Sequence, residues 1–252
     1  MKNLMKYEWR KTLALKLILL GITAAAEIAY LIGAFAHNEN WAAISAGILT
    51  LLAFGGVMVI GLNSIVSLHR DMNTRQGYML FMTPNSCYKI LGAKVLENGL
   101  SMLVTGAFFF GLGALDVMLL FAKFSTVGEL WRFLEDFIHS INNEIQINAF
   151  GMACFFLNLL TGWFAVVIMA YLADVISAAL LNGKKYNGLL SFVLFLALTI
   201  GLRVLEKMVV SALVPQGAGI NTVYLVRSAA TLVFSAAMYV CTAQIMERKL
   251  SV

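Results

Sequence analysis

The chain has 252 residues, of which 61% are hydrophobic and only 12% are charged, and its formal net charge is +5. Soluble domains carry roughly 25% charged residues and roughly 45–50% apolar ones, so this composition excludes an ordinary soluble protein. The basic surplus does not indicate nucleic-acid binding, because the cations form short clusters beside apolar runs. The sequence therefore predicts an all-α integral membrane protein that lies in the lipid bilayer.

Six segments are long and apolar enough to cross a membrane, which takes about 20 residues of helix. We expect them to form a single transmembrane domain over residues 1–252. The expected spans are residues 12–36, 41–67, 95–122, 147–172, 188–207 and 222–244. The first resembles a signal peptide at its start, but its apolar run resumes after Glu27 and exceeds the length of a cleaved leader. We therefore expect a retained first helix.

The positions of lysine and arginine predict the orientation of the spans. With the N-terminus inside, most of the 18 cations fall at the inner ends of the spans, and few fall outside. Cytoplasmic loops of membrane proteins carry an excess of Lys and Arg. We therefore expect a multi-pass protein of the cell membrane with both termini in the cytoplasm.

Two further helices are expected beside the six spans. Residues 1–11 mix apolar side chains with cations and contain Trp9, which favours an interfacial helix in the inner headgroup layer over a frayed basic tail. Between the third and fourth spans, apolar residues recur every three or four positions over residues 127–141. This period is typical of an amphipathic helix, which we expect on the outer membrane face.

The longest basic interruption of the apolar pattern is residues 67–94. It holds Arg70, Arg75, Lys89 and Lys94 against the single acid Asp71. It also contains one of the two prolines of the chain. The expected orientation places this segment in the cytoplasm, between the second and third spans.

The sequence lacks the motifs of nucleotide binding and catalysis. A P-loop needs a glycine five positions before the glycine of its Gly-Lys pair, but Ala178 stands at that distance from Gly183-Lys184, and Lys185 replaces the required Ser or Thr. The three histidines fall in separate loops, and the three cysteines have no metal-binding spacing. We therefore expect no enzymatic activity, no metal and no cofactor in this chain.

Polar residues inside the expected spans are candidates for a substrate path. Glu27 lies near the middle of the first span, where a charge is costly unless it is paired or faces water. Arg203 and Arg227, in the outer halves of the last two spans, are its expected partners. Asn63, Asn98 and Asn158 can line a path or bridge helices. The sequence leaves structural pairing and a substrate-path role open for all six.

The basic segment carries a family resemblance. Residues 70–77 (RDMNTRQG), Thr83-Pro84 and the Gly92-Ala93-Lys94 run before the third span resemble the permeases of ABC-2-type ABC transporters. The resemblance implies a cytoplasmic coupling helix that docks on a separate ABC ATPase subunit, where ATP and magnesium bind. It also implies a homo- or heterodimer of permeases and transport by export. The implied coupling residues are Arg70, Asp71, Arg75, Tyr78, Leu80, Phe81, Pro84, Tyr88 and Lys89.

Two other functions remain open on the sequence. One is the substrate-capturing membrane subunit of an uptake system, which also has about six helices and no P-loop. The other is a membrane scaffold or immunity protein without transport. Co-purification with an ATPase discriminates these from the permease. The sequence does not identify the transported substrate.

Overall fold

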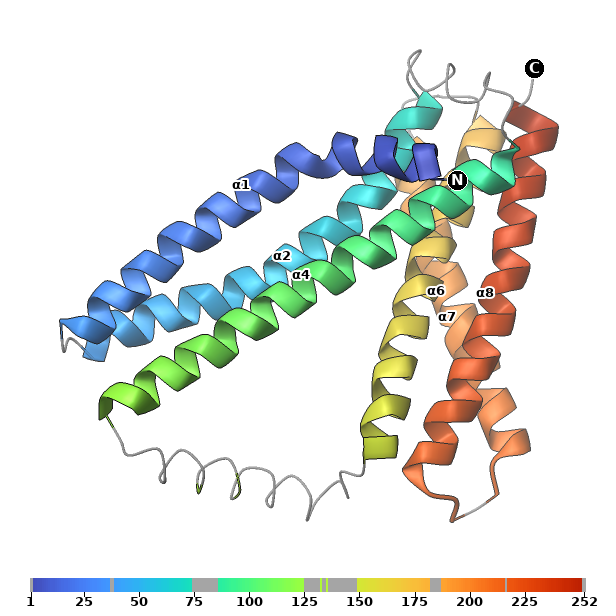
Figure 1. Cartoon of the computed structure of the whole chain (residues 1–252). Coiled ribbons are helices and arrows are strands. Elements are labelled where there is room, and N and C mark those ends of the chain that lie inside the picture. Colours follow the sequence, from blue (N-terminus) through green and yellow to red (C-terminus); the bar gives the residue numbers. More distant parts are fainter. Residues whose placement is uncertain are drawn as a thin grey trace. The chain divides into compact units, whose positions relative to one another are not determined.

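The structure, a computed structural model, describes residues 2–36, 39–73, 86–124, 149–181, 187–215 and 217–250, together with residues 132 and 135. Six long helices account for nearly all of these residues, and there is no strand among them (Figure 1). In chain order the helices are α1 (Lys2–Phe35), α2 (Glu39–Asn73), α4 (Cys87–Phe124), α6 (Ala149–Leu181), α7 (Asn187–Leu213) and α8 (Ile220–Leu250).

All six helices are long and apolar enough to cross a membrane. Six long apolar helices, with no strand among the described residues, are consistent with the expected six-helix membrane protein. Helices are the natural choice here, because a helix satisfies its own backbone hydrogen bonds where no water is present.

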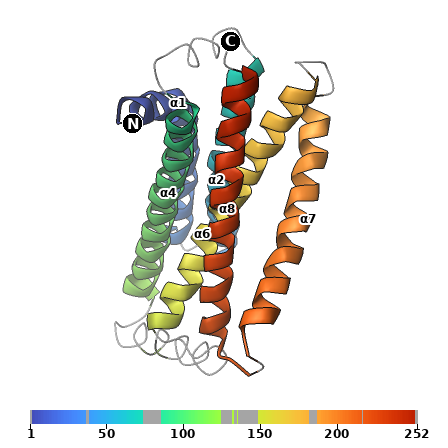
Figure 2. The same cartoon turned by 90° about the vertical axis from the view of Figure 1, so that its right-hand side faces the viewer.

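The helices extend beyond the apolar segments from which they were predicted. Residues 2–11 belong to α1 itself, and their first turns bend away from the rest of that helix (Figure 2). Further along the chain, α6 continues past its expected end at residue 172 to Leu181, and α7 past its expected end at residue 207 to Leu213. Hydropathy locates only the apolar part of a helix, whereas polar flanking residues continue the same backbone hydrogen bonds.

Two predicted helices fall largely outside the described residues. Of the expected coupling helix, residues 74–85 are not described, and only its flanks are. Of the expected outer helix at residues 127–141, the structure describes Arg132 and Glu135, both helical and exposed. Both elements stay predictions.

The tertiary contacts divide the chain into two compact units. The C-terminal unit contains Ser64–Val95 and Gln146–Val252, and the N-terminal unit contains Lys2–Asn63 and Leu96–Ile145. The boundaries at residues 63/64 and 95/96 fall inside α2 and α4, so each of these two helices belongs to one unit at one end and to the other unit at its other end.

Helix α6 is the centre of the C-terminal unit. It packs against both α7 and α8 (Figure 2). Its Val167, Tyr171 and Val175 are fully buried, and they form one cluster with Leu68 of α2 and Leu91 of α4. Close packing and small interface residues hold helices together in lipid, where no hydrophobic driving force acts between them. The fully buried Ala243 of α8 fits this rule.

Local signals fix two of the helix ends. The carbonyl of Ser86 accepts hydrogen bonds from the N–H groups of Lys89 and Ile90, so Ser86 stands at the N-cap of α4, where serine is favoured. Helix α7 ends at Leu213, two residues before Pro215. In the turn that follows, Gly217 has φ +94°, a left-handed conformation that glycine adopts without strain.

Candidate functional site

The predicted coupling residues divide into two groups. Four of them lie at the two helix ends that flank residues 74–86: Arg70 and Asp71 in α2, and Tyr88 and Lys89 in α4. The other five, Arg75, Tyr78, Leu80, Phe81 and Pro84, lie outside the described residues. Of the four, the cations Arg70 and Lys89 are exposed and Asp71 is buried. The flanks therefore present positive charge on their surface.

A buried ion pair joins the two flanking helices. Lys94 Nζ of α4 lies 2.7 Å from Asp71 Oδ2 of α2, and their side chains are only 1% and 11% exposed. Lys94 Nζ also lies 3.4 Å from the hydroxyl oxygen of Ser67. The 2.7 Å contact between Lys94 and Asp71 is a charge-assisted hydrogen bond, which is among the strong hydrogen bonds in proteins. The pair holds the end of α2 beside the start of α4.

Three hydrogen bonds tie these helix ends to α6 and α8. Asp174 Oδ1 of α6 lies 2.6 Å from His69 Nδ1 of α2. The Tyr239 hydroxyl of α8 donates to the carbonyl of Tyr88 in α4, at 2.5 Å. The hydroxyls of Ser64 and Tyr171 also share a hydrogen bond, between α2 and α6. Both ends are thus fixed to the C-terminal unit.

Apolar packing adds to these polar ties. Leu68 and Met72 in α2, and Cys87 and Leu91 in α4, are buried in the same cluster as the α6 side chains. A displacement of one of these helix ends disturbs close contacts with its neighbours, because packed interiors contain few voids. The ends of α2 and α4 that flank residues 74–86 are therefore packed together with α6 in one cluster.

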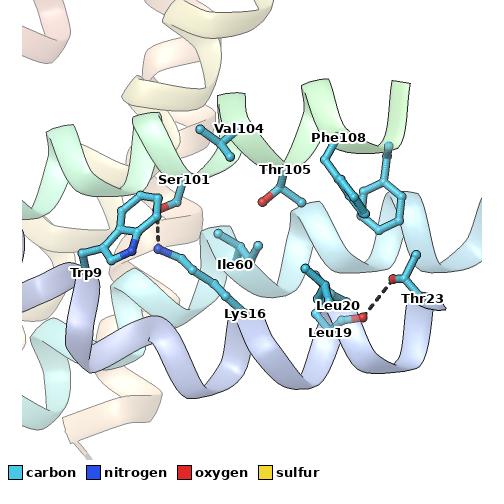
Figure 3. Close-up of a pocket in the computed structure, with 11 residues that line it drawn as sticks. Trp9, Lys16, Leu19, Leu20, Thr23, Ile60, Ser101, Val104, Thr105 and Phe108 are labelled. Atoms are coloured by element: carbon cyan, nitrogen blue, oxygen red, sulfur yellow. Dashed lines mark hydrogen bonds between the residues drawn. The ribbon is translucent and has the colours of Figure 1, made fainter. Parts of the chain in front are cut away.

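The N-terminal unit contains two cavities lined by α1, α2 and α4. The first has a volume of about 210 Å³ and is almost wholly apolar. Figure 3 shows Trp9 and Lys16 at one end of it and Phe108 at the other. Lys16 Nζ lies 3.7 Å from the centre of the Trp9 ring and 2.6 Å from the hydroxyl oxygen of Ser101. The polar end of the cavity is therefore already occupied by a held cation.

The buried carboxylate Glu97 balances this cation. Its Oε1 lies 2.7 Å from Lys16 Nζ and accepts hydrogen bonds from the hydroxyls of Thr12 and Ser101. Glu97 is 4% exposed. Three donors converge on one carboxylate, so α1 and α4 are locked together at this level.

The second cavity has a volume of about 350 Å³ and contains two acids. Glu27 of α1 and Asp116 of α4 both line it. One buried oxygen of each, Glu27 Oε2 and Asp116 Oδ1, has no hydrogen-bond partner among the described residues. Phe109 lines both cavities.

The other predicted intramembrane residues lie at separate places. Asn98 of α4 donates to the carbonyl of Gly61 in α2, at 3.1 Å. Asn158 of α6 donates to the hydroxyl of Ser228 in α8, at 3.4 Å. Asn63 is half-buried in α2. Two of the three asparagines thus connect helices through hydrogen bonds.

The arginines expected beside Glu27 have different surroundings. Arg203 Nη1 lies 3.4 Å from Glu206 Oε2, one turn along α7. Arg203 and Arg227 line one cavity between α7 and α8 in the C-terminal unit. Glu27 lines a cavity of the N-terminal unit together with Asp116.

Sequence reasoning did not single out several residues that the structure brings into pairs. Asp116, Glu97 and Glu206 are single acids within apolar runs, as Glu27 is, and this same signal could have identified them. Their partners could not be identified in this way, because pairing depends on how helices pack. Lys16 was interpreted only as an orientation signal, and Lys94 also as part of the basic segment, although both are held in ion pairs.

Comparison with known proteins gives no family for the chain: no family model, no curated protein and no solved structure matches it.

Proposed function

We propose that this chain is the membrane subunit of an ATP-driven exporter, an ABC-2-type permease, and that residues 70–89 couple it to a separate ATPase subunit. The proposal places both termini and this segment in the cytoplasm. It also requires a second permease subunit and two ATPase subunits, which supply ATP and magnesium binding. The chain itself has no catalytic role in this scheme.

The observation that carries the proposal is the construction of α2 and α4. The ends of these helices that flank residues 74–86 are joined to each other by the Asp71–Lys94 pair, and they are packed on α6. The same helices continue into the N-terminal unit. A force applied to residues 74–86 therefore moves two helices that reach both units. This is the construction that a mechanical coupling segment needs.

The cavities of the N-terminal unit support a path for a substrate. They follow α1 from Trp9 to Tyr30, and Phe109 lines both. Helix α4 lines both, so a displacement of α4 changes their shape. Their mainly apolar walls suit an amphiphilic or apolar substrate better than a small hydrophilic ion. Within this proposal, Glu27 and Asp116 are the polar contacts of the path.

Purification of the intact complex from native membranes tests the proposal. We expect a co-purifying subunit that carries a P-loop, and ATP hydrolysis by the purified complex. Tyr78→Asp, which places a charge in the proposed docking surface, should abolish association. Leu213→Asp is the matched control, because Leu213 is an exposed residue at the far end of α7. The proposal fails if the complex survives both Tyr78→Asp and deletion of residues 75–81.

The two other functions give different results in the same experiment. An uptake subunit would co-purify with a substrate-loaded energy-coupling complex and would bind its substrate without the ATPase. A scaffold or immunity protein would co-purify with no ATPase at all.

A further inference from the structure

The C-terminal unit has a cationic cavity that the proposed transport function does not use. It lies between α7 and α8 and has a volume of about 450 Å³. Three of its six lining residues are cations, Arg203, Lys207 and Arg227. The only acid in the lining is Glu206. We name this the α7–α8 cationic cavity.

Glu206 cannot neutralise the three cations. It is 5% exposed, and its Oε1 accepts a hydrogen bond from the Thr231 hydroxyl at 2.7 Å. Its Oε2 lies 3.4 Å from Arg203. Among the residues that the structure describes, Lys207 and Arg227 have no ion-pair partner. The cavity therefore keeps a positive charge of about two, by simple count of its side chains.

The depth of these cations in the spans raises the cost of leaving them unpaired. Helix α7 has 27 residues, about 40 Å at the usual rise, against a hydrocarbon core of about 30 Å. Lys207 lies six residues before Leu213, the last residue of α7, about 9 Å along the axis. With α7 centred in the bilayer, the backbone of Lys207 lies about 10 Å from the bilayer centre, roughly 5 Å inside the hydrocarbon boundary. From there its long side chain can extend to the layer of the lipid phosphates.

The surroundings of the cavity face lipid. The neighbouring side chains Val204 and Met208 of α7 are 53% and 61% exposed, and Leu225 of α8 is 39% exposed. Exposed apolar side chains of a spanning helix contact acyl chains. A molecule that occupies this cavity therefore meets cations at its centre and apolar surface beside it, which is the profile of an anionic amphiphile.

We propose that the α7–α8 cationic cavity binds a phosphate-type anion, and that this anion is the headgroup phosphate of a membrane lipid with net negative charge. Arg227 supplies a planar fork of donors that matches two phosphate oxygens, and Lys207 supplies a compact charge. Arg203 completes the positive field while it contacts Glu206. The proposal is independent of the transport function and stands or fails separately from it.

A competing explanation needs no ligand. Long cationic side chains near the ends of spans extend toward the headgroup layer and bury only their stems. In that case the attraction to anionic lipid is diffuse, and every cation on that side of the membrane contributes alike. If the lipid instead binds specifically in the cavity, the lining cations contribute far more to its affinity than the other cations do.

Native mass spectrometry of the detergent-purified full chain, titrated with phosphatidylglycerol, phosphatidylcholine or inorganic phosphate, tests the proposal. We expect one tightly bound phosphatidylglycerol and at least about tenfold weaker binding in Lys207→Gln/Arg227→Gln, because charge-assisted hydrogen bonds are lost. The single variant Lys207→Gln, at an exposed side chain, serves if the double variant does not fold. Arg132→Gln is the matched control, since it removes an exposed cation outside the cavity, and its affinity should stay within about twofold of the parent.

Three results would overturn the proposal. Equal affinity of the parent and Lys207→Gln/Arg227→Gln excludes the cavity as the site. Equal losses in that variant and in Arg132→Gln show diffuse attraction. Full occupancy by inorganic phosphate alone, with no gain from the lipid, identifies the soluble anion as the ligand and excludes the lipid.

Discussion

The Asp71–Lys94 pair gives the sharpest stability prediction, because it joins the two helix ends on which the coupling proposal rests. Lys94 Nζ and Asp71 Oδ2 are 2.7 Å apart, and both side chains are almost fully buried. Removing one partner of such a pair costs about 3–5 kcal/mol, because the other charge stays buried without its counter-charge. Lys94→Met keeps the length and the packing of the side chain and removes the charge.

The magnitude translates into a measurable shift in thermal stability. For chains of this size, about 1 kcal/mol shifts the unfolding midpoint by about 2–4 °C. Lys94→Met should therefore lower the midpoint by roughly 6–20 °C. Asp71→Leu/Lys94→Met removes both charges, and replacing a whole buried pair by apolar residues is often neutral. We expect the double variant to recover most of the loss.

The assay is fluorescence-detected size exclusion of the detergent-purified chain after heating, with a midpoint for each variant. Lys89→Met is the matched control, an exposed cation on the same helix that should change the midpoint by less than about 2 °C. The reasoning is refuted if Lys94→Met behaves like Lys89→Met. It is also refuted if Asp71→Leu/Lys94→Met loses as much stability as Lys94→Met alone, or more.

Three further predictions use the same heating assay. Gly33→Ala should destabilise the chain by about 1–3 kcal/mol, because the new Cβ would lie 2.6 Å from the Trp41 ring. Gly47→Ala places its Cβ in open space and should stabilise the chain by up to about 1 kcal/mol. Unfolding midpoints that shift in the same direction for both variants would contradict this. Glu97→Leu should cost about 3–5 kcal/mol of stability, because it leaves Lys16 without its acidic partner. The double variant Glu97→Leu/Lys16→Met should recover most of that stability. If it does not, the unpaired charge is not the cause of the loss. Tyr239→Phe should cost about 0.5–1.5 kcal/mol through the lost hydrogen bond to α4, and an unchanged midpoint argues against that tie.

The spans could be predicted from the sequence because their signal is local. A helix in lipid needs about 20 apolar residues in a row, and such runs are visible without knowledge of the packing. The ends were less accurate, as α1 shows: it begins at Lys2, ten residues before the apolar run. Polar residues continue a helix as readily as apolar ones, so hydropathy does not locate the end.

The partners of buried charges could not be predicted, because they depend on the packing of helices distant in sequence. Lys16 and Glu97 are 81 residues apart, and nothing in either segment indicates the other. Glu27 was expected beside Arg203 or Arg227, on the argument that an acid needs a base. Within its own unit, Glu27 lines a cavity together with a second acid, Asp116 of α4, and nothing in either segment indicates the other.

The division into two units was also beyond the sequence. Both boundaries lie close to the ends of the basic segment at residues 67–94, but that segment indicates a loop between spans and not a division between units. The boundaries follow from which neighbours each half of α2 and α4 contacts. These boundaries show that the helices flanking residues 74–86 reach both units, which the basic charge of the segment did not indicate.

The most direct test of the coupling claim is a photo-crosslinking experiment at position 78 of the full chain in native membranes. A photoreactive amino acid in place of Tyr78 should form a covalent adduct with a P-loop-bearing ATPase, and the same probe in place of Leu213 should form none. An adduct with the ATPase at position 78 alone is the predicted result. Adducts with lipid only at position 78, or equal ATPase adducts at both positions, would contradict the account.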